Sequence, residues 1–106
     1  MKSVVKSNAF DFTGRVAAIT GGAGVLCGEI AAALAEAGAQ VALLDLVPER
    51  AERWVPRLKE AGSPFEVMAC DVLKRDSIQS AFETVVRRFG KIDFLINGAG
   101  GNHPKA

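Results

Sequence analysis

The sequence predicts an α/β fold, a three-layer sandwich in which helices cover both faces of a parallel sheet. Four short apolar runs alternate with longer stretches whose apolar residues recur at helical spacing. The runs are hydrophobic almost throughout, which is typical of strands buried on both sides in a parallel sheet. The predicted order is therefore β-α-β-α-β-α-β. Right-handed crossovers between parallel strands then give the strand order 3-2-1-4.

The predicted strands are each six residues long and end where polar or turn residues begin. They cover Arg15–Thr20, Gln40–Asp45, Phe65–Cys70 and Ile92–Asn97. The last of them takes an outer position in the predicted order, so we expect an uncovered edge there. These strands form one half of a doubly wound nucleotide-binding fold, the N-terminal part of a Rossmann fold.

The first two helices are predicted from alanine content and from prolines. An alanine-rich segment from Leu26 to Ala37 is followed by Gly38, and glycine often ends a helix. The second helix starts near Pro48, because proline is favoured in a first helical turn. Pro56 then falls inside this helix, where proline removes a hydrogen bond and costs about 3 kcal/mol, so we expect a kink or an early end.

The third helix has the clearest pattern. Asp76 and Gln79 have the spacing of a capping box, and Gly90 follows the last apolar residue. Its apolar stripe predicts packing against the sheet and consists of Ile78, Phe82, Val85 and Phe89.

Length and composition limit the classes of protein. The 106 residues, 49% of them hydrophobic, suffice for one small domain. We expect a flexible tail over residues 1–9 and, over residues 10–106, a partial Rossmann domain that is truncated after the fourth strand. The formal net charge is +1 with no basic block, so neither nucleic acid nor a membrane surface is an expected partner.

The same reading predicts a cytoplasmic protein. No apolar run approaches the length of a membrane span, and the N-terminus lacks the features of a secretory signal. Cys27 and Cys70 are too few for a disulfide scaffold or a zinc site. We therefore expect reduced thiols and no metal.

Glycines cluster between the first predicted strand and the first predicted helix, at positions 21, 22, 24 and 28. Such a loop brings backbone N–H groups onto a pyrophosphate, and the following helix adds the positive end of its dipole. Glycine is needed where the dihedral angles are unusual or where a Cβ atom would block the ligand. From the glycines alone, a tight turn that holds no ligand stays an open alternative.

Three polar residues follow the other predicted strands, on the edge where open α/β sheets bind ligands. Asp45 is placed to accept hydrogen bonds from both hydroxyls of an adenosine ribose, and it would repel a 2′-phosphate, which favours NAD over NADP. Asp71 is placed to meet an adenine amino group, and Asn97 opens a glycine-rich segment beside the ribose. Alternatively, both aspartates cap turns, and Asn97 belongs to a turn without a ligand.

Three motifs together resemble the N-terminal part of a short-chain dehydrogenase/reductase. They are "TGGAGVLC" from Thr20 to Cys27, the pair Asp71-Val72, and "NGAG" from Asn97 to Gly100. The resemblance extends from "FDFTGRVAAITGG" to "GKIDFLINGAGG", and the family patterns are T-G-x-x-x-G-x-G and N-N-A-G. Within the family, "GGAGVLCGEIA" and "NGAGGNHPKA" are similar to fructuronate (D-mannonate) oxidoreductases.

The resemblance implies that residues 10–106 are a partial NAD(P)-binding Rossmann domain with a set of contacts to an NAD cofactor. They are Gly21, Ala23, Gly24, Leu26, Asp45, Leu46, Asp71, Val72, Asn97, Ala99 and Gly100. It implies an NAD-dependent oxidoreductase that acts on a carbonyl or secondary alcohol, such as the sugar acid fructuronate. Homo-oligomers are expected only for the full-length enzyme.

The catalytic residues of the family lie outside these motifs. Its members use a serine and a Tyr-x-x-x-Lys pair, and the 106 residues contain no tyrosine. We therefore assign no catalytic residue and expect the chain alone, an adenosine-binding half, to be inactive. One alternative is an inert truncated nucleotide-binding fragment. Another is an adenosylmethionine methyltransferase, which the segment "INGAGG" disfavours because that class has no counterpart to it.

The sequence departs from the family pattern at three positions. Val25 and Cys27 stand where the family has glycine, and Gly98 stands where it has asparagine. Our hypothesis is that the glycines at 22, 24 and 28 replace the missing ones, with a slightly different turn. For His103 and Cys27 we favour non-catalytic roles, and for Trp54 we favour packing of the second helix onto the sheet.

Overall fold

The four strands form one parallel sheet in the order β3-β2-β1-β4, as predicted. The computed structural model describes residues 11–98. The strand bounds are β1 Val16–Thr20, β2 Gln40–Asp45, β3 Phe65–Ala69 and β4 Phe94–Asn97. The predicted tail over residues 1–9 and the predicted contacts Ala99 and Gly100 lie outside the described residues, as does His103.

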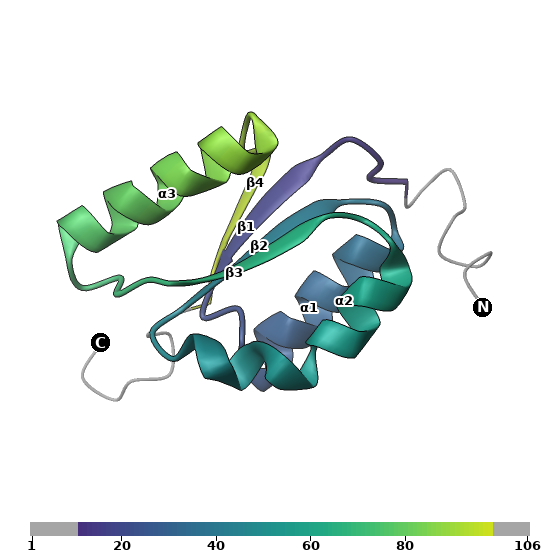
Figure 1. The fold of residues 1–106 in the computed structure, drawn as a ribbon, viewed down its shortest axis with the longest axis horizontal. Coiled ribbons are helices and arrows are strands. Elements are labelled where there is room, and N and C mark those ends of the chain that lie inside the picture. Colours follow the sequence, from purple (N-terminus) through teal and green to yellow (C-terminus); the bar gives the residue numbers. More distant parts are fainter. Residues whose placement is uncertain (1–10, 99–106) are drawn as a thin grey trace.

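Helices cover both faces of the sheet, which confirms the three layers (Figure 1). The helices α1 (Val25–Glu36) and α2 (Val55–Ala61) lie on one face, and α3 (Arg75–Phe89) lies on the other. None of the helices within residues 11–98 is long and apolar enough to cross a membrane.

Alternation along the strands divides the core into two clusters. In β1, Ala17 and Ile19 pack with α1 and α2, whereas Val16 and Ala18 pack toward α3. All four side chains are fully buried, because successive residues of a strand point to opposite faces and both faces are covered. The predicted stripe of α3 supplies the second cluster, with Val85 at its centre and Ile78, Phe82 and Phe89 around it.

The segment between β2 and β3 confirms the effect expected of Pro56. It starts as a 3₁₀ helix, η2 (Pro48–Arg53), and α2 begins only at Val55. Pro56 therefore lies in the first turn of a new helix, where the missing N–H group is not needed.

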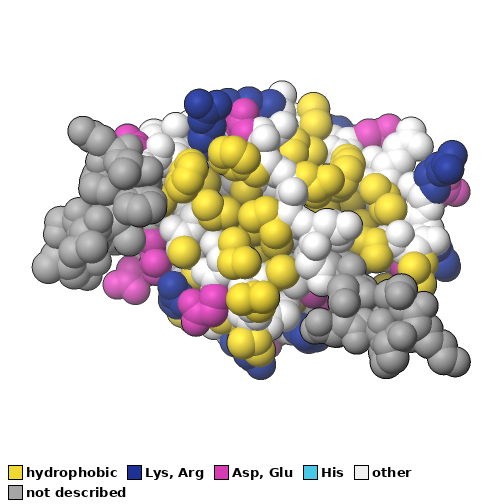
Figure 2. Space-filling model, turned by 180° about the vertical axis from the view of Figure 1, so that it is seen from behind, with side chains coloured by type: hydrophobic (Ala, Val, Ile, Leu, Met, Phe, Trp, Pro, Cys, Tyr) yellow, Lys and Arg dark blue, Asp and Glu magenta, His cyan; other side chains and the backbone are white. Residues whose placement is uncertain are grey.

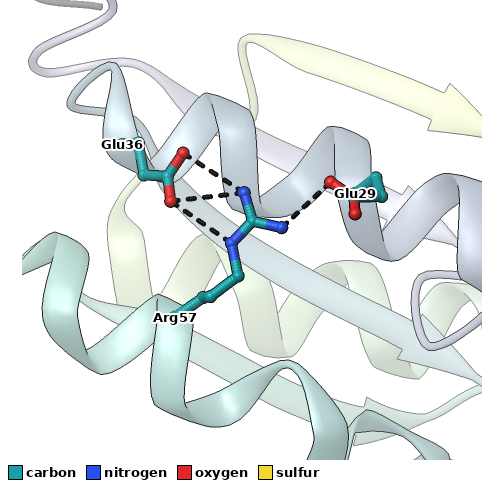
Figure 3. Close-up of polar contacts among 3 residues, drawn as sticks. All are labelled: Glu29, Glu36 and Arg57. Carbon is teal, nitrogen blue, oxygen red and sulfur yellow. Dashed lines mark hydrogen bonds and ion pairs between the residues drawn. The ribbon is translucent and has the colours of Figure 1, made fainter. Parts of the chain in front are cut away.

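An ion-pair cluster joins the two helices on that face. Figure 3 shows Arg57 of α2 reaching between Glu29 and Glu36 of α1. The Arg57 guanidinium lies 2.9 Å from Glu29 and 3.3 Å from Glu36, measured between N and O atoms. The hydrogen bond to Glu29, together with the charges of both carboxylates, raises the pKa of Arg57. The two acids are seven residues apart and so share one face of α1.

The start of α3 differs from the prediction, because the capping box does not form. The N-cap residue is Lys74, without a side-chain capping bond, and Asp76 lies inside the first turn. The preceding turn sets this start: the Lys74 N–H donates to the Asp71 carbonyl at 3.0 Å, and the Asp71 N–H donates to Ser77 Oγ at 2.8 Å. Gly90 ends the helix as predicted, with φ of 90°.

β4 lies at one edge of the sheet, as expected. Its Phe94 and Leu95 side chains are 36% and 54% exposed. Figure 2 shows hydrophobic side chains gathered on the side of the molecule opposite to that seen in Figure 1.

The Asp93 carboxylate ties the loop before β4 to the start of β1. It accepts a hydrogen bond of 2.8 Å from the Val16 N–H and lies 3.2 Å from Lys91 Nζ. The Val16 bond is the chief cause of a lowered Asp93 pKa, and Lys91 and Arg15 lower it further. A lowered folded-state pKa stabilises the fold above the unfolded-state value of about 3.9. This stabilisation is lost as the pH falls through the folded-state pKa.

Asp93→Asn is therefore expected to lower the free energy of unfolding near neutral pH, and less so in acid. Asparagine keeps an acceptor for Val16 but loses the charge. Urea unfolding of the wild type and the variant between pH 7 and pH 3 measures the difference between their free energies of unfolding. This difference should become smaller below about pH 4. Glu52→Gln, at an exposed carboxylate of η2, is the control. A difference that stays constant across this pH range would contradict the role of the ionised Asp93 carboxylate in stabilising the fold.

Candidate cofactor site

The predicted site residues meet at the carboxyl ends of the parallel strands. Asp45 and Asn97 are the last residues of β2 and β4, and Asp71 follows β3 by two residues. The glycine loop connects the end of β1 to α1. The end of the sheet at which the strands have their carboxyl termini thus carries the glycine loop, two carboxylates and an amide.

Two glycines of the loop are required by its geometry. Gly21 has φ of 66°, in the left-handed region that side chains disfavour. A Cβ atom on Gly22 would lie 2.8 Å from the Ile19 carbonyl oxygen and 2.8 Å from Leu43 Cδ2, so this residue must be glycine. The loop is consequently pressed against the ends of β1 and β2.

The start of α1 is open to a ligand. Gly24 is the N-cap residue, and no side chain caps the first turn. Val25 and Leu26 are 63% and 72% exposed. The exposed Val25 side chain stands where the family pattern has glycine. The free N–H groups of this turn are suited to an anion.

Trp54 holds the loop from below, a role that goes beyond the predicted packing. Its indole is 6% exposed and packs so closely on Gly28 that a Cβ atom there would overlap the ring. The Trp54 Nε1–H group donates to the Ala23 carbonyl oxygen at 3.3 Å. A buried tryptophan usually donates a hydrogen bond from its indole N–H group, so the sequence indicates that Trp54 has an acceptor. It does not indicate which residue supplies that acceptor.

Asp45 ties the end of β2 to the same loop. Its carboxylate is buried, with 4% exposure, and accepts hydrogen bonds from the Ala23 N–H at 3.0 Å and from the Val47 N–H at 2.8 Å. Arg50, which is half exposed, lies 3.9 Å from it. The turn-capping interpretation of Asp45 is thus part of the structure, and its carboxylate also borders the loop.

Asp71 caps its own turn, as the alternative interpretation proposed. Its Oδ1 atom accepts a hydrogen bond from the Leu73 N–H at 3.0 Å. Val72 is half buried in the cluster under α3, and Leu46, after Asp45, is 66% exposed. Next to Asp71, burial raises the pKa of the Cys70 thiol, which keeps it protonated.

The ends of β1 and β4 are joined by polar contacts. Thr20 Oγ1 donates to Asn97 Oδ1 at 2.7 Å, and the Gly98 N–H donates to the Thr20 carbonyl oxygen at 3.1 Å. The predicted residue Asn97 therefore fixes the spacing between the ends of β1 and β4. Over residues 11–98, no group of three His, Cys, Asp or Glu residues is placed to hold a metal ion.

A parallel sheet in the order 3-2-1-4, with a glycine loop between its first strand and first helix, defines a Rossmann-type dinucleotide-binding fold. The chain belongs to the short-chain dehydrogenase family, whose sequence profile matches residues 15–106.

Relatives of known sequence or structure agree with this family. The chain is 45% identical over 96 residues to the uncharacterized oxidoreductase UxuB of Bacillus subtilis, covering 91% of this chain and 34% of the relative. A Haemophilus influenza protein provisionally assigned as a D-mannonate oxidoreductase, with bound NAD, superposes with a TM-score of 0.80 at 38% identity, covering 91% of this chain and 34% of that one. The NADPH-dependent 3-quinuclidinone reductase of Rhodotorula rubra superposes with a TM-score of 0.74 at 38% identity. The match covers 81% of this chain and 33% of that one. The chain thus spans about a third of the length of these relatives.

Proposed function

We propose that this chain binds the adenosine and pyrophosphate parts of NAD for an oxidoreductase. The reaction is hydride transfer between the nicotinamide and a carbonyl or secondary alcohol. The observation that carries the proposal is the buried Asp45 carboxylate, hydrogen-bonded to Ala23 in the glycine loop. This bond places an acidic group at the end of β2 beside an open helix N-terminus, the arrangement that suits a ribose followed by a pyrophosphate.

Each part of the cofactor has its own partners in this proposal. The pyrophosphate lies on the loop and the first turn of α1, and the adenosine ribose lies at Asp45 and Leu46. The adenine lies near Asp71 and Val72. The full set is Gly21, Ala23, Gly24, Leu26, Asp45, Leu46, Asp71, Val72, Asn97, Ala99 and Gly100.

Asp45 supports NAD over NADP as the cofactor. A carboxylate at this position accepts the ribose hydroxyls and repels a 2′-phosphate. The NAD bound by the Haemophilus relative is consistent with this preference. The same relative supports a sugar acid as the substrate class, with fructuronate as the first compound to test.

The chain alone is expected to bind NADH weakly, to bind NADPH more weakly still, and to reduce no carbonyl substrate. It carries no tyrosine, so it lacks the general acid that contributes roughly 10²- to 10⁴-fold to such a reduction. Isothermal titration calorimetry measures both affinities, and NADH absorbance with fructuronate measures turnover. Tighter binding of NADPH would remove Asp45 from its proposed role. Turnover by the purified chain would contradict the second part.

A further inference from the structure

Two departures from the family pattern lie in contact with each other. Cys27 is in the first turn of α1, and Gly98 directly follows β4. A Cβ atom added to Gly98 would overlap Cys27 Sγ, while it would lie 3.7 Å from Cys27 Cβ, an ordinary van der Waals distance. The conflict is therefore with the sulfur atom alone on the side of α1.

The backbone around Gly98 is not free to move away. Its N–H group points at Thr20, 3.1 Å from the carbonyl oxygen and 3.2 Å from Oγ1. A Cβ atom on Gly98 would also lie 3.1 Å from the Thr20 carbonyl oxygen. With Asn97 bonded to Thr20 Oγ1, the end of β4 is fixed against β1.

The turn that carries Cys27 is fixed on its other side. Gly28, the next residue, lies against the Trp54 ring, and the Gly28 N–H donates to the Gly24 carbonyl oxygen at 2.8 Å. Trp54 also binds the Ala23 carbonyl oxygen in the same loop. The thiol of Cys27 thus lies between a fixed strand end and a fixed helix turn.

We propose that Cys27 is a positioning residue for the cofactor loop and that it acts through Gly98. Its sulfur atom fills the space that glycine leaves above the end of β4, and so it sets how close the first turn of α1 lies to the ends of β1 and β4. The inference rests on the proposed function, because the N–H groups of this turn are the ones assigned to the pyrophosphate. Hydrogen bonds weaken steeply with distance and misalignment, so a displaced turn binds the anion less well.

A double-mutant cycle tests the pair. Gly98→Ala is expected to weaken NADH binding at least about tenfold, and Cys27→Ala, which leaves the space above the end of β4 unfilled, to weaken it by about three- to tenfold. The double variant Cys27→Ala/Gly98→Ala should bind NADH several-fold more tightly than Gly98→Ala, because the two Cβ atoms then lie at an ordinary distance and only the contact of 3.1 Å with the Thr20 carbonyl oxygen stays tight. Cys27→Ser/Gly98→Ala is the control: it keeps an atom at the γ position and should not recover. Calorimetry gives the dissociation constants, and thermal unfolding gives the midpoints.

The two readouts separate positioning from stability. A purely structural role would shift the midpoints and leave NADH binding unchanged well below them, which would overturn the inference. Equal binding by Gly98→Ala and wild type, or a double variant no better than Gly98→Ala, would also overturn it. If Gly98→Ala does not fold, a folded, NADH-binding double variant supports the pair, and an unfolded one rejects it. If the wild type binds no NADH, both the proposed function and the positioning role fail. Non-additive changes in the unfolding midpoints of the variants would then show only that residues 27 and 98 are in steric contact.

Discussion

Asp45→Asn is expected to weaken NADH binding by about ten- to a hundredfold and to lower the free energy of unfolding. Each carboxylate oxygen accepts a backbone hydrogen bond, one from the glycine loop and one from Val47. An amide offers one oxygen and turns an NH₂ group toward the other donor. Hydrogen bonds to charged groups contribute about 1.5–3 kcal/mol, and 1.4 kcal/mol corresponds to about tenfold in affinity. Calorimetry with NADH and urea unfolding measure the two effects.

The control for this variant is Arg50→Gln, which removes only the ion pair. Arg50 is 56% exposed and 3.9 Å from Asp45, and such pairs contribute about 0–1 kcal/mol. Asp45→Asn that loses stability but keeps the NADH affinity of the wild type would reduce Asp45 to a turn cap. Unchanged stability would contradict the role of its two hydrogen bonds.

Gly28→Ala is expected to destabilise the fold by about 1–3 kcal/mol, although alanine is the better helix former. In an unhindered helix the same exchange stabilises by about 0.5–1 kcal/mol. Here the new methyl group would overlap the Trp54 ring, which cannot withdraw without losing its bond to Ala23. Urea unfolding gives the sign directly.

The cause of this effect is tested in a second background. With Trp54→Leu the obstacle is gone, and Gly28→Ala is then expected to be neutral or stabilising. Ala33→Gly, at an exposed position of α1, measures the helix preference alone. A stabilising effect of Gly28→Ala beside an intact Trp54 would show that the ring moves aside without cost.

The sheet was predictable because its residues allow little else. The strands are almost wholly apolar, which requires cover on both faces, and right-handed crossovers limit such a sheet to a few doubly wound orders, of which 3-2-1-4 is a common one. The positions of Asp45 and Asn97 at strand ends follow from that order. Pro56 marked the change of helix correctly, because its effect on the backbone is local.

The contacts between distant residues were not predictable. The capping box predicted at Asp76 does not form, because the turn at Asp71 places the N-cap two residues earlier, at Lys74. Nothing local in the sequence links Trp54 to Ala23, or Cys27 to Gly98. Such pairs depend on how a loop, a helix and a strand end meet, and that is set only when all three are in place.

Trp54 gives this molecule a built-in optical probe. It is the only tryptophan of the 106 residues, and there is no tyrosine, so the ultraviolet emission of the folded chain comes almost entirely from one indole ring beneath the glycine loop. Reduced nicotinamide absorbs where indole emits, so a docked cofactor would quench that light through energy transfer. Movements of the loop can therefore be followed in solution, without a label, from the colour and intensity of a single side chain.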